Sequence, residues 1–183
     1  MSKVCVFLAD GFEECEGLIT VDILRRAGAE VTMASITGKT QVTGSHRIPI
    51  TADALAETLS LDGFDLLVLP GGMPGTTHLG ESALVTGAVQ QFVRQGKRVA
   101  AICAAPSVLG ALGLLRGKKA TCYPGFEEAL EGAEITGAEA VTDGLITTGQ
   151  GLGAAIPFAL ELTALLEGPQ KAQKVRQGIV YQH

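Results

Sequence analysis

The stretch VCVFLADGFEECEGLITVDILRRAGAEVTMA, residues 4–34, contains two apolar runs separated by an amphipathic segment. Residues 4–8 are apolar on both faces of an extended chain, which is typical of a central strand in a parallel sheet. Residues 13–27 repeat apolar side chains at helical spacing and end at Gly28, a helix stop. Residues 30–34 form the second strand. A strand, a helix and a strand in this order predict a right-handed β-α-β crossover.

The same alternation continues along the rest of the chain. We expect a hairpin over 36–52, strands over 66–69 and 99–102, helices over 82–95, 106–115 and 151–166, short strands and a short helix within 118–150, and a last, more polar helix that begins at Pro169. This order predicts one α/β domain over residues 1–183, with a doubly wound, mostly parallel sheet and helices on both faces.

Composition and charge exclude several classes of function. The net charge of −5 and the absence of a basic cluster argue against a specific nucleic-acid site. No apolar run is long enough to span a membrane, and the first residues do not resemble a signal peptide. The four cysteines, Cys5, Cys15, Cys103 and Cys122, form no CxxC pair and none lies at ligand spacing from a histidine. We therefore expect free thiols in a reducing, cytoplasmic compartment and no metal site.

Three strand ends carry unusual sequences: ADGFEECE at 9–16, PGGMPG at 70–75 and AICAAP at 101–106. In open α/β sheets the ligand crevice lies beyond the carboxyl ends of the parallel strands. These three segments are therefore expected to converge on one site.

Cys103 follows a buried strand and precedes a helix that Pro106 can start. Its small neighbours permit a sharp turn, similar to the nucleophile elbow of hydrolases. The positive potential of a helix N-terminus favours a thiolate, which predicts a thiol pKa below the usual value of about 8.5. The alternative is a buried structural cysteine, the usual fate of a free thiol. The strand-to-helix position favours the reactive interpretation.

Glu13, Glu14 and Glu16 begin the first helix, where acidic side chains are favoured electrostatically. We expect that role for two of them, and a third that faces the Cys103 sulfur. Beside a thiolate such a carboxyl would stay protonated and could act as an acid or a base. The Gly71-Gly72 pair offers backbone N–H groups for an oxyanion site, although such turns are common.

The histidines do not support a hydrolase triad. His46 lies in the expected hairpin, and no histidine follows Cys103 before His183. His78 follows the glycine-rich turn, from which it could approach the site, although a surface position is favoured. A cysteine-histidine-acid triad in the usual hydrolase order is therefore not expected.

Five segments, in this order along nearly the whole chain, together resemble the ThiJ/PfpI superfamily in its DJ-one branch. They are LADGFEECE at 8–16, VDILRRAG at 21–28, LPGG at 69–72, AAICAAP at 100–106 and DGLITT at 143–148. The resemblance implies a flavodoxin-like sandwich that needs no cofactor. It also implies a homodimer that pairs through the helix at residues 14–27.

The resemblance assigns roles to individual residues. It makes Cys103 the nucleophilic, oxidisable cysteine and selects Glu16 as the carboxyl that hydrogen-bonds to it. Gly71 and Gly72 match the backbone oxyanion site, and Ala104 supplies the N–H group beside the sulfur. Two positions depart from the pattern. Tyr123 stands where some relatives have a histidine, and His46 and Arg47 stand at or beside a site arginine, so these three are candidates for the substrate pocket.

The resemblance implies a glyoxalase that converts methylglyoxal and glyoxal to lactate and glycolate, classed as a lyase or hydrolase. The same chemistry on early glycation adducts would give protein and nucleotide deglycase activity in carbonyl stress. The alternative is a redox-sensing stress protein or chaperone that acts through oxidation of Cys103. A thiol amidase or peptidase is disfavoured by the missing histidine.

Overall fold

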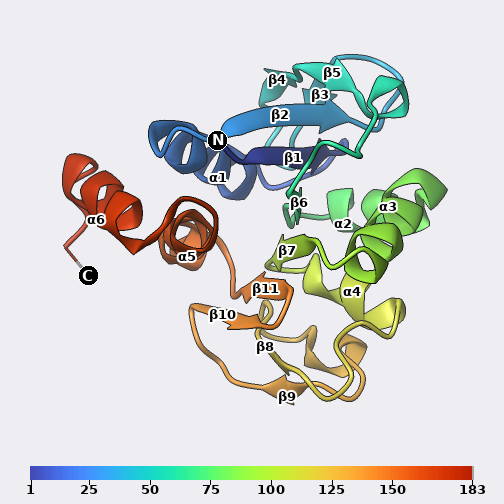
Figure 1. Ribbon diagram of the computed structural model, residues 1–183. Coiled ribbons are helices and arrows are strands. Elements are labelled where there is room, and N and C mark those ends of the chain that lie inside the picture. The colour runs from blue at the N-terminus through green and yellow to red at the C-terminus, as the bar shows by residue number, and fades with distance from the viewer. Residues whose placement is uncertain (183) are drawn as a thin grey trace.

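The computed structural model describes residues 1–182 of the chain (Figure 1). The strands are β1 (Lys3–Leu8), β2 (Glu30–Ser35), β3 (Gln41–Thr43), β4 (Pro49–Thr51), β5 (Ala54–Leu55), β6 (Leu66–Leu69), β7 (Arg98–Ile102), β8 (Lys119–Ala120), β9 (Glu134–Ile135), β10 (Ala140–Asp143) and β11 (Ile146–Gly149). The helices are α1 (Glu14–Arg26), α2 (Gly75–Glu81), α3 (Ala83–Arg94), α4 (Pro106–Ala111), α5 (Ala155–Glu167) and α6 (Pro169–Gly178).

Within the described residues the central sheet has seven strands in the order β10-β11-β7-β6-β1-β2-β5. All neighbours pair in parallel except β10, which runs antiparallel to β11. The five central strands therefore follow the flavodoxin-like order 2-1-3-4-5, and the order reverses between β1 and β6. The expected flavodoxin-like, mostly parallel sheet is confirmed.

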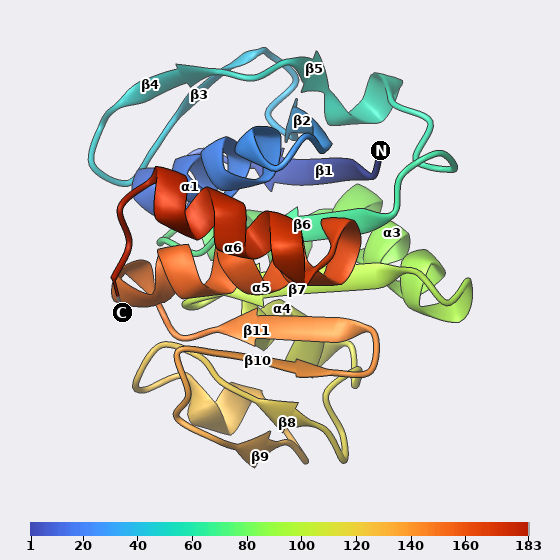
Figure 2. The ribbon, with the colours of Figure 1, turned by 60° about the vertical axis from the view of Figure 1, so that its left-hand side comes forward.

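Alternate residues of each central strand enter different cores, as expected for a sheet that is covered on both faces. In β1, Cys5 and Phe7 pack with α3 and α4, whereas Val4, Val6 and Leu8 pack with α1 and α5. Figure 1 shows α1, α5 and α6 on one side of the sheet and α2, α3 and α4 on the other. In Figure 2 the helix α6 lies over α5, outside the first layer.

The register brings the carboxyl ends of β1, β6 and β7 to one edge of the sheet. Val6 pairs with Val68, and Val68 pairs with Ala100. The segments that follow these strands therefore start at the same level, as the sequence predicts. This edge lies at the switch in strand order, where ligands bind in such folds.

Three elements differ from the sequence-based expectations. The helix expected over 151–166 begins at Ala155, after a 3₁₀ turn at Leu152–Ala154. The helix expected over 106–115 ends at Ala111, because the chain turns at Gly113, whose φ of 71° lies in the left-handed region. The helix α2 begins at Gly75, inside a glycine-rich segment that indicates only a turn. Its two glycines lower intrinsic helix propensity, so tertiary packing decides its conformation. Among the described residues, no helix has the length and apolar character required to cross a bilayer.

Candidate active site

Cys103 occupies the turn between β7 and α4 with a φ of 66°, a left-handed conformation that is strained for any residue other than glycine. Two backbone hydrogen bonds hold it there. Its N–H group donates to the carbonyl oxygen of Gly149 at 3.0 Å, and its own carbonyl oxygen accepts from the N–H group of Tyr123 at 2.8 Å. The expected elbow is therefore present, and neighbouring segments over-determine its strained conformation.

Backbone N–H groups also surround the Cys103 sulfur. Those of Ala104 and Gly72 donate to it, and both contacts favour the thiolate. The side chain is partly buried, so a small molecule can still reach it. Of the two glycines expected at an oxyanion site, Gly72 lies against the sulfur. The N–H group of Gly71 instead donates to Glu16 Oε2 at 3.0 Å.

Glu16 approaches the sulfur from the first turn of α1 and is 1% exposed. Its Oε1 atom is buried and has no donor of normal geometry among the described residues. The carboxyl interacts with the Cys103 thiol. Gly71 lies between the two side chains, because a Cβ atom there would fall 2.5 Å from Cys103 Cβ and 2.6 Å from Glu16 Oε2. The absence of a side chain at Gly71 is what lets the acid and the thiol meet.

The electrostatics differ from the sequence-based expectation of a low thiol pKa. Burial, followed by the charge and hydrogen bond of the Glu16 carboxylate, raises the pKa of Cys103 to about 12. Burial also raises the pKa of Glu16 to about 7, against the hydrogen bonds from Cys103 and Gly71 that lower it. The expectation overvalued the helix N-terminus, because α4 has only six residues. Since two adjacent buried anions are disfavoured, the pair keeps one proton, on the thiol, after Glu16 has ionised above about pH 7.

The three carboxylates at the start of α1 have three separate roles. Glu13 is the N-cap, and its Oε2 accepts from the N–H group of Glu16 at 2.7 Å. Glu14 is buried and points to the hairpin formed by β3 and β4, where it accepts from the N–H groups of His46 at 2.8 Å and Ile48 at 3.4 Å. Only Glu16 faces Cys103. The structure thus places inward the residue that the family resemblance selected.

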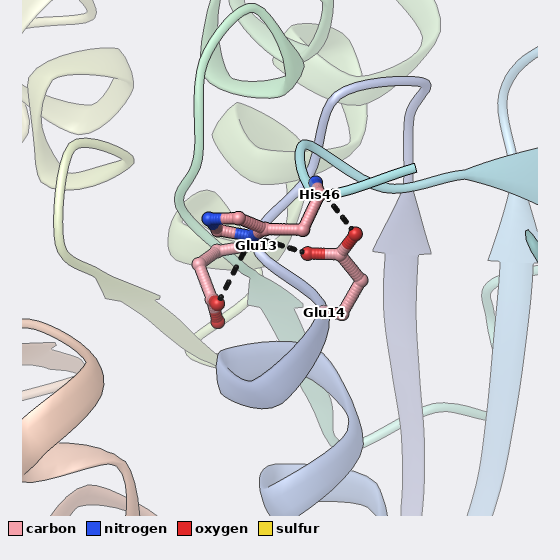
Figure 3. A group of neighbouring side chains, drawn as sticks. All are labelled: Glu13, Glu14 and His46. Atoms are coloured by element: carbon pink, nitrogen blue, oxygen red, sulfur yellow. Dashed lines mark hydrogen bonds and ion pairs between the residues drawn. The ribbon is translucent and has the colours of Figure 1, made fainter. Parts of the chain in front are cut away.

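Figure 3 shows how the His46 ring lies beside Glu13 and Glu14. His46 Nδ1 is 3.0 Å from Glu14 Oε2 and 3.9 Å from Glu13 Oε1, and the Glu14 carboxylate raises the pKa of His46. The contacts of His46 tie the hairpin tip to α1, and the neighbouring Arg47 has a φ of 65°. Within the described residues no hydrogen bond or ion pair joins His46 or Arg47 to Cys103, so their role in a substrate pocket stays a prediction.

The same three side chains form the group in the described residues whose ligand atoms lie close enough to meet a metal ion, within 4.8 Å of one another. Backbone N–H groups of the hairpin already donate to Glu14, which accounts for its burial without an ion. Hydrogen bonding within the protein therefore explains this arrangement.

The structure also shows what the other expected residues contact. His78 is exposed, and its Nδ1 atom lies 2.8 Å from the carbonyl oxygen of Asp10. His183 lies outside the described residues. Tyr123 holds the Cys103 carbonyl through its backbone, and its side chain is half exposed. Gly149 also holds the elbow, but its position at the end of a short strand gives no sequence signal for that role.

Comparison with known proteins gives a consistent result. The family model described as DJ-1/PfpI family matches residues 2–165. The chain is 39% identical to protein dj-1beta of Drosophila melanogaster over 98% of both chains, and 36% identical to a deglycase of Pyrococcus abyssi over 78% of this chain and 86% of that protein. The oxidized structure of Toxoplasma gondii DJ-1 superposes with a TM-score of 0.96 at 36% identity and covers both chains completely.

Proposed function

Because this chain belongs to the DJ-1/PfpI family, we propose that it is a cofactor-free, cysteine-dependent glyoxalase that converts methylglyoxal and glyoxal to lactate and glycolate, with deglycase activity on early glycation adducts. The observation that carries the proposal is the contact between Cys103 and the buried carboxyl of Glu16, beside two backbone N–H groups. The deglycase among its relatives supports the same chemistry.

In the first step the Cys103 sulfur attacks the aldehyde carbon and a C–S bond forms. The thiol proton passes to Glu16, whose pKa of about 7 suits a general base at neutral pH. The N–H groups of Gly72 and Ala104 lie beside the sulfur, where they stabilise the charge that develops on the aldehyde oxygen. Glu16 then returns the proton to that oxygen, and the product is a hemithioacetal.

The second step is an internal rearrangement. Glu16 removes the proton from the former aldehyde carbon and gives it to the ketone oxygen, which forms an enediol. It then removes the proton from the hydroxyl group on the former aldehyde carbon and delivers it to the adjacent carbon. The former aldehyde carbon becomes a thioester, and the former ketone becomes a hydroxyl group. Water then adds its OH to the acyl carbon and its H to the sulfur, which breaks the C–S bond. The sum adds one water to methylglyoxal and gives lactate, so the reaction consumes no oxidant or reductant.

The test is to incubate the protein with methylglyoxal and measure lactate. We expect sustained lactate production by the wild type and by Cys15→Ser, which removes an exposed thiol outside the site, and none by Cys103→Ala. Lactate formation that does not exceed that of Cys103→Ala would overturn the proposed activity.

A second candidate function is redox sensing through Cys103, which fits the oxidized structure of the Toxoplasma gondii relative. On mild peroxide treatment we expect Cys103 to gain oxygen first, because Glu16 can accept its thiol proton, the N–H groups of Ala104 and Gly72 stabilise the reacting thiolate, and protonated Glu16 can then hydrogen-bond to the sulfinate. Cys15 is the exposed competitor, whereas Cys5 and Cys122 are buried. Intact mass and peptide mapping measure the order, and earlier oxidation of the other three thiols would exclude a sensor.

The expected homodimer through α1 remains a proposal. Leu18 and Ile19 of α1 line a cavity of about 500 Å³, together with Ile156 and Val180. Val180 is 73% exposed, so this face presents apolar surface that a second copy could cover. The proposed activity does not depend on this pairing.

A further inference from the structure

A cavity of about 450 Å³ is lined by residues of two segments that also hold the Cys103 elbow. One wall is the segment at Tyr123 and Pro124, and the other is the loop that follows β11, residues 150–154. Tyr123, in the first wall, donates its N–H group to the Cys103 carbonyl oxygen, and Gly149, which accepts from the Cys103 N–H group, directly precedes the second wall. Each wall therefore begins at, or directly after, a residue that is hydrogen-bonded to the Cys103 backbone.

The cavity is larger than a three-carbon dicarbonyl requires, and its volume lies in the range of ordinary ligand pockets. It also collects exposed apolar side chains. Eight large hydrophobic residues are exposed among the described residues, and two of them, Tyr123 at 50% and Leu152 at 48%, line this one cavity. Such side chains gain contact area when an apolar group covers them.

The position of the Tyr123 ring depends on its neighbour. A Cβ atom at Gly151 would lie 3.3 Å from Tyr123 Cδ2, so the ring packs against the bare backbone of Gly151. Two further lining residues are joined by a backbone hydrogen bond, because the N–H group of Gln150 donates to the carbonyl oxygen of Glu139 at 2.9 Å. Of the described residues that line the cavity, Glu139 contributes the one acidic side chain, and none is basic. An anionic ligand would be repelled, whereas a neutral one is accepted.

We propose that this cavity is a subsite for the non-reacting part of the substrate, and that it favours 2-oxoaldehydes with an uncharged aryl or bulky alkyl group on the ketone carbon. The aldehyde carbon would meet the Cys103 sulfur, and the substituent would lie between Tyr123 and Leu152. The inference rests on the proposed glyoxalase function and deepens it, because it assigns specificity to residues outside the acid–thiol pair.

The test compares phenylglyoxal with methylglyoxal as substrates. We expect Tyr123→Ala and Leu152→Ala to lower the ratio of their kcat/KM values about tenfold, since one well-packed apolar contact is worth roughly that factor. Tyr123→Phe keeps the ring and should keep the ratio. Leu84→Ala removes an exposed leucine of α3, far along the chain from this lining, and should leave the ratio unchanged. If Tyr123→Ala and Leu152→Ala lowered kcat/KM equally for both substrates, the subsite would be overturned.

A second measurement separates the subsite from the proposed function. We measure the rate at which N-phenyl iodoacetamide alkylates Cys103 and divide it by the rate with iodoacetamide. This ratio reports binding of the phenyl group and does not require catalytic turnover. We expect Tyr123→Ala to lower this ratio as well, and an unchanged ratio would count against the subsite. A wild-type protein that makes no hydroxy acid but prefers the phenyl reagent would contradict the glyoxalase and retain the subsite.

Discussion

Glu16→Gln should lower kcat for methylglyoxal by about 10²- to 10⁴-fold at pH 7, the range typical of a lost general acid–base catalyst. The amide keeps the size of the side chain and can still contact the N–H group of Gly71, but it cannot accept the thiol proton. Cys103 would then have to lose its proton to solvent from a buried position. Activity at the wild-type level in this variant would show that Glu16 does not carry the proton.

The dependence of the Cys103 reaction rate on pH tests whether Glu16 accepts the thiol proton. In the wild type the rate should rise with pH as Glu16 loses its proton, with a midpoint near its pKa of about 7. The variant should lack that inflection, and its rate should rise only at higher pH as the thiol itself ionises. Iodoacetamide labelling followed by mass spectrometry measures this profile at Cys103. A wild-type midpoint far below 7 would instead indicate a permanently formed thiolate.

The same variant has a second readout in the free energy of unfolding. The folded-state pKa of Glu16 lies near 7, above its ordinary value of 4.5, so the folded state binds the proton more tightly. This contribution stabilises the fold below about pH 4.5 and is lost as pH rises through 7, a change of about 3 kcal/mol. Glu16→Gln has no such loss. The free energy of unfolding of the variant, relative to wild type, should therefore increase by that amount from pH 4.5 to 7.5. If the two proteins instead changed in parallel with pH, the raised pKa of Glu16 would be contradicted.

The elements that position this site are those with the clearest sequence patterns. Short runs that are apolar on both faces of an extended chain predict the strands of the sheet. The glycine and proline residues that follow these runs mark the carboxyl ends of the strands. The convergence of residues 9–16, 70–75 and 101–106 follows from topology alone, since the ends of neighbouring parallel strands share one edge. The sequence is therefore sufficient to identify Cys103 as a candidate reactive thiol.

Other features depend on contacts that periodicity does not describe. The three glutamates at the start of α1 are alike in sequence, and only the direction of each side chain separates the N-cap, the hairpin contact and the partner of Cys103. The thiol pKa depends on the balance of burial, a neighbouring charge and two N–H donors. The wall formed by residues 150–154 has no chemical motif, because its role comes from its position beside the elbow.

Gly71→Ala is the second substitution for which we expect a large effect. The new Cβ atom would lie 2.5 Å from Cys103 Cβ, 2.6 Å from Glu16 Oε2 and 2.9 Å from the carbonyl oxygen of Ile102, all closer than atoms normally pack. Because the Ile102 contact is with the backbone of a central strand, the acid and the thiol must move apart. A displacement of about 1 Å between reacting groups can cost about 10²-fold in rate, so we expect at least that loss in kcat.

Gly87→Ala is the matched control, since Gly87 is exposed in α3 and a Cβ atom there meets nothing within 4 Å. It should leave kcat unchanged and stabilise the fold by about 0.5–1 kcal/mol, because alanine is the better helix former. Gly71→Ala should destabilise by about 1–3 kcal/mol, the usual cost of overpacking. Thermal melting establishes the folded fraction, and lactate production is compared per folded molecule. If folded Gly71→Ala turned over methylglyoxal at the wild-type rate, close contact between Glu16 and Cys103 would not be required for the reaction, and the proton would have to travel by another route.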